Sequence, residues 1–256
     1  MYKIDVLLQG FPGRSVFHGT LGWSTSTLLR SSERCILVDV GAFGARHLMA
    51  QQLAELQVRA EDVTDVVLTH AHYDHAVNFT LFPNATVWIG DQELTWAAAQ
   101  PPGFDALPEL YVRELAASSR TRRIADGERF LPGFLAITAP GHTPGHLLFY
   151  VDGQEQPLLF TGDAAKNRAE LLSMSVADTY DADISRNSLA LIWEHWRRVP
   201  GTLLVPGHDL CMRLDEAGQP QYVGERRAAL NTWLGDTLNP TRIDLCCGGQ
   251  MARYSA

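Results

Sequence analysis

The segment THAHYDH, residues 69–75, constrains the fold and the chemistry of this chain more than any other part of it. Three apolar residues lead directly into it, which predicts that the segment follows a buried strand. His70 and His72 are two positions apart and project the same way from an extended backbone, while Asp74 and His75 follow at a turn and point apart. Imidazole and carboxylate groups bind zinc and similar divalent metals. One histidine at a strand end is commonly a polar cap, but four potential ligands in one turn predict a site for two metal ions.

Three further potential ligands occur in matching positions later in the chain. His142 lies in APGHTPGH, Asp163 in LLFTGD and His208 in LLVPGHD. Each follows an apolar, strand-like run and has a glycine beside it, which lets the chain turn sharply and the backbone approach closely. Sites of α/β proteins gather at such strand ends. Each motif is weak by itself, but together with residues 69–75 they predict one converging site.

Short strand-like runs alternate with helical patterns in both halves of the chain. The strand-like runs are apolar or β-branched and are bounded by Gly, Pro, Asp or Ser. They are Ile4–Leu8, Thr25–Leu29, Cys35–Val40, Val63–Thr69, Thr86–Ile89, Phe134–Ala139, Leu147–Val151, Pro157–Phe160 and Thr202–Val205. Apolar residues at three- and four-residue spacing predict helices over Ala45–Leu56, Asp91–Ala99, Ser185–Val199 and Tyr222–Leu234. Two sheets with helices outside both would bury these stripes, so we expect an α/β fold in one domain over residues 1–256.

The segment Pro101–Arg123 departs from this rhythm. We expect an inserted loop with a helix around Leu107–Ala117. A lid over the site and a surface connection without function are both compatible with the sequence.

The composition limits the classes of function. A formal charge of −8 gives no basic surface of the kind that nucleic-acid binding needs, so we expect a small-molecule substrate and no nucleic acid. No segment approaches the ~20 apolar residues of a membrane span, and Asp5 interrupts any signal-peptide core, so we expect a cytoplasmic protein without membrane association. The four cysteines are then expected to be free thiols, with metal binding by Cys246 and Cys247 as the alternative. The sequence leaves a homodimer open.

The motifs HAHYDH, GHTPGH, TGD and PGH resemble, in this order, the metal-binding motifs of the metallo-β-lactamase superfamily. The resemblance extends from Leu37 to His208 and includes Asp39 in LVDVG, where the family usually carries an aspartate that supports the metal loop. It implies a four-layer αββα sandwich with the site at one edge. It also implies two divalent metal ions, the first held by His70, His72 and His142 and the second by Asp74, His75 and His208, with Asp163 bridging them.

The same resemblance implies hydrolysis by the metal pair. Zinc is the metal expected first, and identical ligands also accept manganese, iron or cobalt. Two metals about 3.5–4 Å apart lower the pKa of a shared water from ~15.7 toward ~7. A hydroxide bridging the metals would attack the carbonyl of a small ester, lactone or thioester, with Asp74 and Asp163 acting through the metals. Lys166 follows Asp163 by three and fits a contact with a substrate carboxylate or oxyanion, although a solvated helix start is the alternative.

Lys166 also bears on the subclass. The chain is most similar to the small lactonase-like and glyoxalase-II-like hydrolases of the superfamily. In its lactonases a tyrosine commonly stands where this chain has Lys166, which argues against a lactonase assignment. Tyr180 is a tyrosine that could reach the site from the following loop.

Three other activities of the superfamily are alternatives. β-Lactamases are exported, and this sequence carries no export signal. Nucleases of the family usually carry an extra domain or arm and a basic surface, and we expect neither here, which argues against phosphodiesterase or nuclease activity. Sulfur dioxygenases use one iron and leave part of the second site unused, whereas all second-site ligands are present here.

Overall fold

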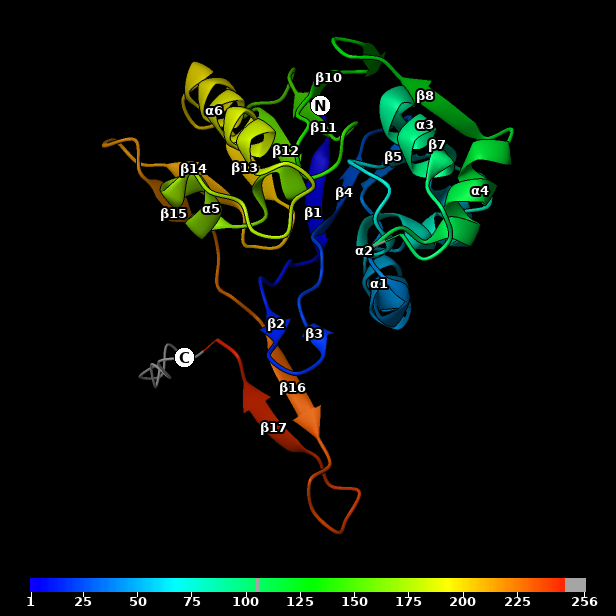
Figure 1. Ribbon diagram of the computed structural model, residues 1–256, viewed down its shortest axis with the longest axis vertical. Helices are drawn as coiled ribbons and strands as arrows, with labels where there is room; N and C mark the ends of the chain where they lie inside the picture. Colours follow the sequence, from blue (N-terminus) through cyan, green and yellow to red (C-terminus); the bar gives the residue numbers. More distant parts are fainter. Residues whose placement is uncertain (105, 247–256) are drawn as a thin grey trace. The chain divides into compact units, whose positions relative to one another are not determined.

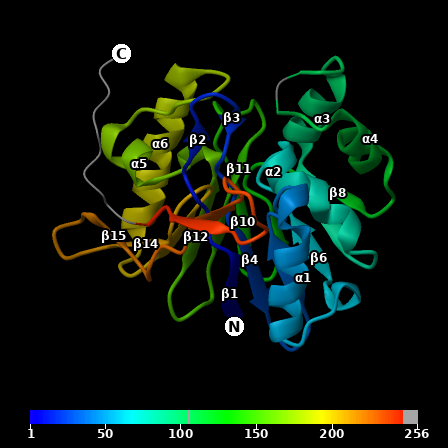
Figure 2. The same cartoon turned by 90° about the horizontal axis from the view of Figure 1, so that it is seen from below.

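The computed structural model describes residues 1–104 and 106–246, and the chain divides into two compact units, Met1–Val223 and Gly224–Ala256. All of the predicted metal-binding motifs lie in the first unit. That unit contains two large sheets, with its longer helices on the outer faces of both (Figure 1; Figure 2).

The first sheet has six strands in the order β1-β4-β5-β6-β7-β8. Strands β5 to β8 are parallel to one another, and β4 pairs antiparallel with both β1 and β5. The strands are β1 (Lys3–Leu8), β4 (Ser26–Arg30), β5 (Cys35–Val38), β6 (Asp65–Val67), β7 (Thr86–Gly90) and β8 (Thr121–Ile124). The helices of this half are α1 (Arg46–Glu55), α2 (Tyr73–Ala76), α3 (Asp91–Ala99) and α4 (Glu109–Ala117).

The second sheet has seven strands in the order β15-β14-β13-β12-β11-β10-β9. Strands β12 and β13 are parallel, and the other neighbours are antiparallel. The strands are β9 (Arg129–Leu131), β10 (Phe134–Thr138), β11 (Leu147–Val151), β12 (Leu158–Gly162), β13 (Leu203–Pro206), β14 (Met212–Leu214) and β15 (Pro220–Tyr222). Helices α5 (Arg168–Ser173) and α6 (Ala182–Arg198) follow in this half, and a short hairpin near the N-terminus pairs β2 (Arg14–Ser15) with β3 (Gly19–Thr20).

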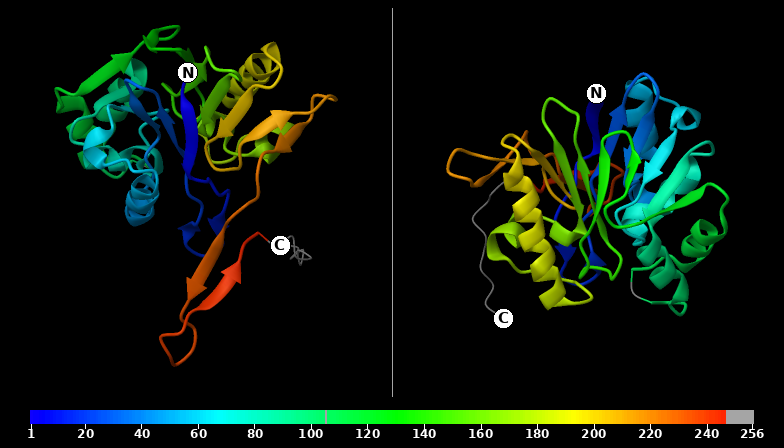
Figure 3. Two further views of the ribbon diagram at one scale, coloured as in Figure 1. Left: turned by 180° about the vertical axis from the view of Figure 1, so that it is seen from behind. Right: turned by 90° about the horizontal axis from the view of Figure 1, so that it is seen from above.

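Three separate hydrophobic cores show that the first unit has four layers. Successive side chains of β5 point into two different cores. Leu37 packs with the helices of the first sheet, whereas Ile36 and Val38 pack between the two sheets. The third core joins the second sheet to α6, where Trp196 packs with buried leucines of β11 to β13. The predicted αββα sandwich is therefore confirmed, and the views from behind and from above show the helices outside the paired sheets (Figure 3).

Most predicted elements are confirmed, but the helix predicted over Tyr222–Leu234 is wrong. Tyr222 ends the edge strand β15, and β16 (Ala229–Thr232) pairs in antiparallel register with β17 (Thr241–Asp244) in the second unit. The spacing suggested a stripe of core residues, but Val223 and Leu234 are exposed. The helical spacing of apolar residues therefore does not mark a buried face in this segment.

The segment Pro101–Arg123 is part of the fold of the first half rather than an inserted loop. Val112 and Leu115 of α4 are buried in the core beside α3, and β8 extends the first sheet. Residues near the start of the segment line the pocket described below, so it contributes to the site without forming a separate flap.

Two further predictions concern the cysteines and the membrane. Cys35, Cys211 and Cys246 are free thiols, while Cys247 lies outside the described residues. Within residues 1–104 and 106–246, no helix combines the length and the apolar character that crossing a bilayer requires.

Candidate metal centre

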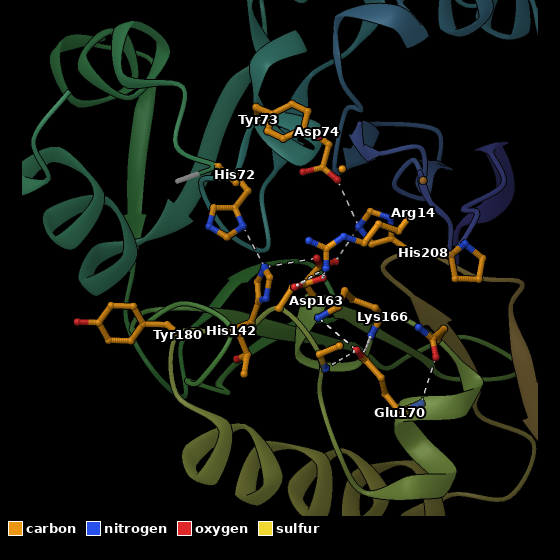
Figure 4. A pocket seen from close by; sticks show the side chains of 18 of the residues that line it. Arg14, His72, Tyr73, Asp74, His142, Asp163, Lys166, Glu170, Tyr180 and His208 are labelled. Carbon is orange, nitrogen blue, oxygen red and sulfur yellow. Dashed lines mark hydrogen bonds and ion pairs between the residues drawn. The ribbon is translucent and has the colours of Figure 1, made fainter. Parts of the chain in front are cut away.

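The predicted ligands come from four loops that follow strands of both sheets. Residues 69–75 follow β6 and run into the short helix α2, which contains Asp74 and His75, and His142 lies between β10 and β11. Asp163 directly follows β12, and His208 follows β13, the parallel neighbour of β12. Parallel strands end at the same edge of a sheet, which places these last two side chains together, and Figure 4 shows them converging with the residues from the first half.

The nitrogen and oxygen atoms of the predicted ligands form three overlapping clusters. Within each cluster, the ligand atoms all lie within 4.8 Å of one another. The clusters are His70, His72 and His142; His70, His75 and Asp163; and Asp74, His75 and His208. The structure thus brings together all seven residues that the sequence singled out as ligands.

Asp163 lies between the first and the last of these clusters. Its Oδ1 is 3.1 Å from Nε2 of His75 and 3.2 Å from Nε2 of His208. Its Oδ2 lies on the other side, 3.4 Å from Nε2 of His142. The two oxygens of one carboxylate therefore face two different groups of imidazoles, which is the arrangement that a bridging ligand needs.

The surroundings of His70 Nε2 indicate whether the clustered ligand atoms fit a metal ion. The ring is completely buried, and no described residue forms a hydrogen bond with Nε2. Its other nitrogen, Nδ1, is 3.0 Å from the hydroxyl of Thr69, which favours the tautomer whose Nε2 carries the lone pair. A buried acceptor without a partner is costly, and coordination to a cation would satisfy it. The donor set therefore fits a divalent transition metal.

The electrostatics of the cluster also suit a cation. Burial lowers the pKa of His70 and of His142 well below 6.5, so both rings are neutral donors. Burial lowers the pKa of His75 and His208 as well, but the carboxylate of Asp163 and its neighbours outweigh burial and the net pKa is raised. Burial raises the pKa of Asp163, yet the facing histidines hold it well below 3.8. Ionised carboxylate and imidazoles at this density form an anionic, nitrogen-rich pocket for metal ions.

Asp39 supports the loop of residues 69–75 from beneath. It is buried, and its carboxylate accepts hydrogen bonds from the backbone N–H of Thr69 at 2.9 Å and from the Thr69 hydroxyl at 2.9 Å. Its Oδ2 is also 2.8 Å from Nδ1 of His75. These contacts orient the ring of His75 directly and that of His70 through Thr69, which is the supporting role that the sequence predicted for Asp39.

His146 positions Asp163 through the backbone. The backbone N–H of Asp163 donates to Nε2 of His146 at 3.1 Å, and burial lowers the pKa of His146 to about 3. The ring is therefore a neutral acceptor under the bridging position.

Glu93 is a buried residue of the site that sequence reasoning missed. It lies in the first turn of α3, and its carboxylate accepts hydrogen bonds from Ala71, Thr143 and Gly145. Burial raises its pKa to about 7. Glu93 shares the buried face of α3 with Ala97, four residues on, but an acidic residue in a first helical turn carries no local signal of this role.

A pocket of about 680 Å³ opens onto the predicted ligands (Figure 4). Part of its lining is aromatic, and the ring of Trp96 lies 5.9 Å from those of both Phe104 and Tyr180. Tyr180 therefore reaches the pocket, as its position in the sequence suggested. This aromatic surface suits an apolar part of a substrate.

Charged residues also line the pocket. Lys166 lines the pocket, and its Nζ lies 3.3 Å from Glu170. Arg14 of the β2–β3 hairpin pairs with Asp178 at 3.1 Å, with both side chains largely exposed. An exposed ion pair of this kind contributes little to stability.

The αββα sandwich and the converging clusters of potential metal ligands together define the class of this protein. A family model described as the Metallo-beta-lactamase superfamily matches residues 19–208, and the chain belongs to that superfamily.

Curated relatives include two enzymes named as N-acyl homoserine lactonases. The one from Bacillus cereus is 25% identical over 221 residues, which cover 77% of this chain and 85% of the relative. The one from Bacillus sp is 26% identical over 165 residues, and the match covers 64% of this chain and only 62% of that relative's length. A hydroxyacylglutathione hydrolase from Pseudomonas syringae is 29% identical over 133 residues, 52% of this chain and 43% of the relative.

Solved structures share the fold at low identity. A Thermotoga maritima protein assigned to the metallo-beta-lactamases has a TM-score of 0.67 and 23% identity, covering 83% of this chain and 99% of the other. A dizinc quorum-quenching lactonase in complex with a product has a TM-score of 0.61 and 20% identity, covering 80% of each chain.

Proposed function

We propose that this protein hydrolyses a small carboxylic ester, lactone or thioester with two divalent metal ions. The observation that carries the proposal is the position of Asp163, whose two carboxylate oxygens face separate imidazole groups. The names of the relatives add support, because lactonases and a hydroxyacylglutathione hydrolase both act on acyl bonds.

The ligand sets follow from the clusters. His70, His72 and His142 would hold the first ion, Asp74, His75 and His208 the second, and Asp163 would contact both. When bound, two such ions, most readily zinc, lower the pKa of a water toward about 7 and polarise a carbonyl.

The chain's own residues provide orientation and binding. Asp39 and Thr69 orient the rings of His75 and His70 through Nδ1, which leaves Nε2 of each ring as the atom that would bind a metal. Lys166, at the pocket wall, would donate to an oxygen of the substrate and balance negative charge there. The rings of Trp96 and Tyr180 would pack against the apolar part of the substrate.

Lys166 bears on the choice among acyl substrates. A lysine is charged where a tyrosine would be a neutral donor, so the site favours a substrate with a carboxylate near the scissile bond. Thioesters and esters that themselves carry a carboxylate near the scissile bond are therefore the first candidates, ahead of neutral lactones.

The test is a screen of the purified protein loaded with zinc, manganese, cobalt or iron against lactones, thioesters, β-lactams and phosphodiesters. We expect turnover of an acyl substrate with a metal content of about two ions per chain. The variants Asp74→Ala and His208→Ala should lose one ion and turnover, whereas His47→Ala, which removes an exposed histidine of α1, should keep both. Full activity in His208→Ala, or a single iron per chain with no acyl hydrolysis, would contradict the proposal.

A further inference from the structure

Glu93 is an acidic side chain buried in the first half of the molecule with no exposed surface. Its Oε1 accepts a hydrogen bond from the backbone N–H of Ala71 at 2.9 Å. Its Oε2 accepts from the hydroxyl of Thr143 at 2.7 Å and from the backbone N–H of Gly145 at 3.2 Å. Both oxygens are therefore engaged, and all three donors belong to loops that carry predicted metal ligands.

The positions of these donors tie Glu93 to one metal site. Ala71 lies between His70 and His72, and Thr143 directly follows His142. The loop 69–75 and the loop 140–146 come from different sheets, and Nε2 of His142 nevertheless lies 2.9 Å from Nδ1 of His72. One carboxylate thus spans the two loops that carry all three proposed ligands of the first ion.

The backbone of α3 packs directly against the second loop. A Cβ atom at Gly145 would meet the backbone N and Cα of Glu93 and would lie 2.6 Å from the carbonyl carbon of Gln92. No side chain fits between the helix and the loop. The first turn of α3 and the loop 140–146 are therefore packed as one unit, and the Glu93 carboxylate extends from this unit to the backbone N–H of Ala71.

Fold stability alone does not account for a carboxylate at this position. Burying a carboxyl group costs free energy, and the hydrogen bonds of that group compensate for the cost without adding a net gain. An apolar residue of similar volume would pack there without that cost. However, an apolar residue could not form hydrogen bonds with both loops and fix their positions relative to each other. Glu93 is not among the described residues that line the pocket, so it does not act on the substrate directly.

We infer that Glu93 is a positioning residue that sets the geometry of the first metal site by joining the loop of His70 and His72 to the loop of His142. This inference rests on the proposed function, because it assigns those three histidines to one ion. It does not involve the second ion, since none of the three donors to Glu93 adjoins Asp74 or His208.

The test measures zinc affinity by competition with a chromophoric chelator, for each ion separately. A His208→Ala background retains the first site, and a His142→Ala background retains the second. In the first background, Glu93→Gln should weaken zinc binding about 10- to 100-fold, as loss of a supporting hydrogen bond to a metal site does. In the second background, the same change should alter zinc affinity by less than about twofold, because none of the three donors to Glu93 adjoins Asp74 or His208.

A second variant and a matched control guard against a general loss of folding. Thr143→Val removes only the hydroxyl that donates to Glu93, and it should shift zinc affinity in the same direction by a smaller factor. Glu114→Gln, an exposed glutamate of α4, should leave zinc affinity unchanged. In the otherwise intact enzyme, Glu93→Gln should lower kcat with little change in KM, since the substrate pocket is untouched.

The two proposals fail in different ways. If the unaltered protein binds two ions and hydrolyses its substrate while Glu93→Gln and Thr143→Val leave zinc affinity unchanged, or weaken both sites equally, the inference about Glu93 is wrong and the proposed function stands. If the unaltered protein binds no metal, the proposed function itself fails.

Discussion

Oδ2 of Asp39 lies 2.8 Å from Nδ1 of His75, across 36 positions of the sequence. The contact directs the other nitrogen of the ring, Nε2, toward Asp163. Asp39, directly after β5, thus orients a ligand that follows β6, the neighbouring strand of the same sheet.

Replacing Asp39 with Asn tests this support. The amide keeps the size of the side chain but lacks one acceptor oxygen, so the His75 ring and the Thr69 backbone lose part of their fixation. We expect metal affinity and kcat/KM to fall about 10- to 100-fold. Zinc titration and steady-state kinetics measure both, and Asp152→Asn, which changes an exposed carboxylate, is the control. Unaltered zinc binding in Asp39→Asn would remove Asp39 from the site.

Lys166→Ala tests substrate recognition. The ammonium group lines the pocket beside Glu170, and its loss should raise KM for a substrate that carries a carboxylate by about tenfold, a value typical of one charged hydrogen bond. A neutral ester of similar size should be affected much less. Lys3→Ala, at the exposed start of β1, is the matched control. Equal changes for charged and neutral substrates would exclude a role in recognising the charge.

Gly207→Ala tests how closely the two metal-bearing strand ends pack. A Cβ atom there would meet Oδ1 of Asp163 and would lie 2.6 Å from the carbonyl oxygen of Gly162. Because backbone cannot move aside cheaply, the added methyl group should displace the bridging carboxylate. We expect loss of at least one metal ion and most activity, whereas Gly44→Ala, which meets no atom within 4 Å, should behave like the unaltered protein. Measuring the metal content of both variants tests this prediction.

The pH dependence of stability should contain a contribution from Glu93. Its pKa is raised from 4.5 to about 7 in the folded protein, so the folded state binds more protons than the unfolded state between these values. The contribution is fully present below pH 4.5 and is lost as pH rises through about 7, which amounts to about 3 kcal/mol over the whole interval. In chelator-treated protein, the unfolding free energy of Glu93→Gln relative to the unaltered chain should therefore increase from pH 5 to pH 8. A difference that stays constant with pH would show that Glu93 does not titrate in this range.

The ligands could be predicted from the sequence because each is marked locally. His142, Asp163 and His208 follow apolar strands and stand beside glycine, and the strand ends of a layered α/β fold meet at one edge. The aspartate at position 39 also stood at a strand end. Residue type, local spacing and strand polarity marked the candidate ligands, whereas their division between two ions and the role of Asp39 followed from the resemblance to the metallo-β-lactamase superfamily.

Other features depend on contacts that no local pattern records. Glu93 reads as an ordinary acidic residue at the start of a helix, and its role emerges only when two distant loops lie against it. The edge strands β8 and β15 are short and polar on one face, so they lack the apolar runs that mark central strands. The helix expected over Tyr222–Leu234 failed for the opposite reason, because a helical spacing of apolar residues occurred where no core was present.

Metal content measured on the same sample as acyl-bond hydrolysis tests the two-metal proposal most directly. Protein stripped with a chelator should be inactive, and stepwise addition of zinc should restore hydrolysis in parallel with occupancy, reaching a maximum at about two ions per chain. Asp163→Asn should bind metal more weakly at both positions and stay inactive at that zinc level. Full hydrolysis in the metal-free protein, or in Asp163→Asn, would contradict the account.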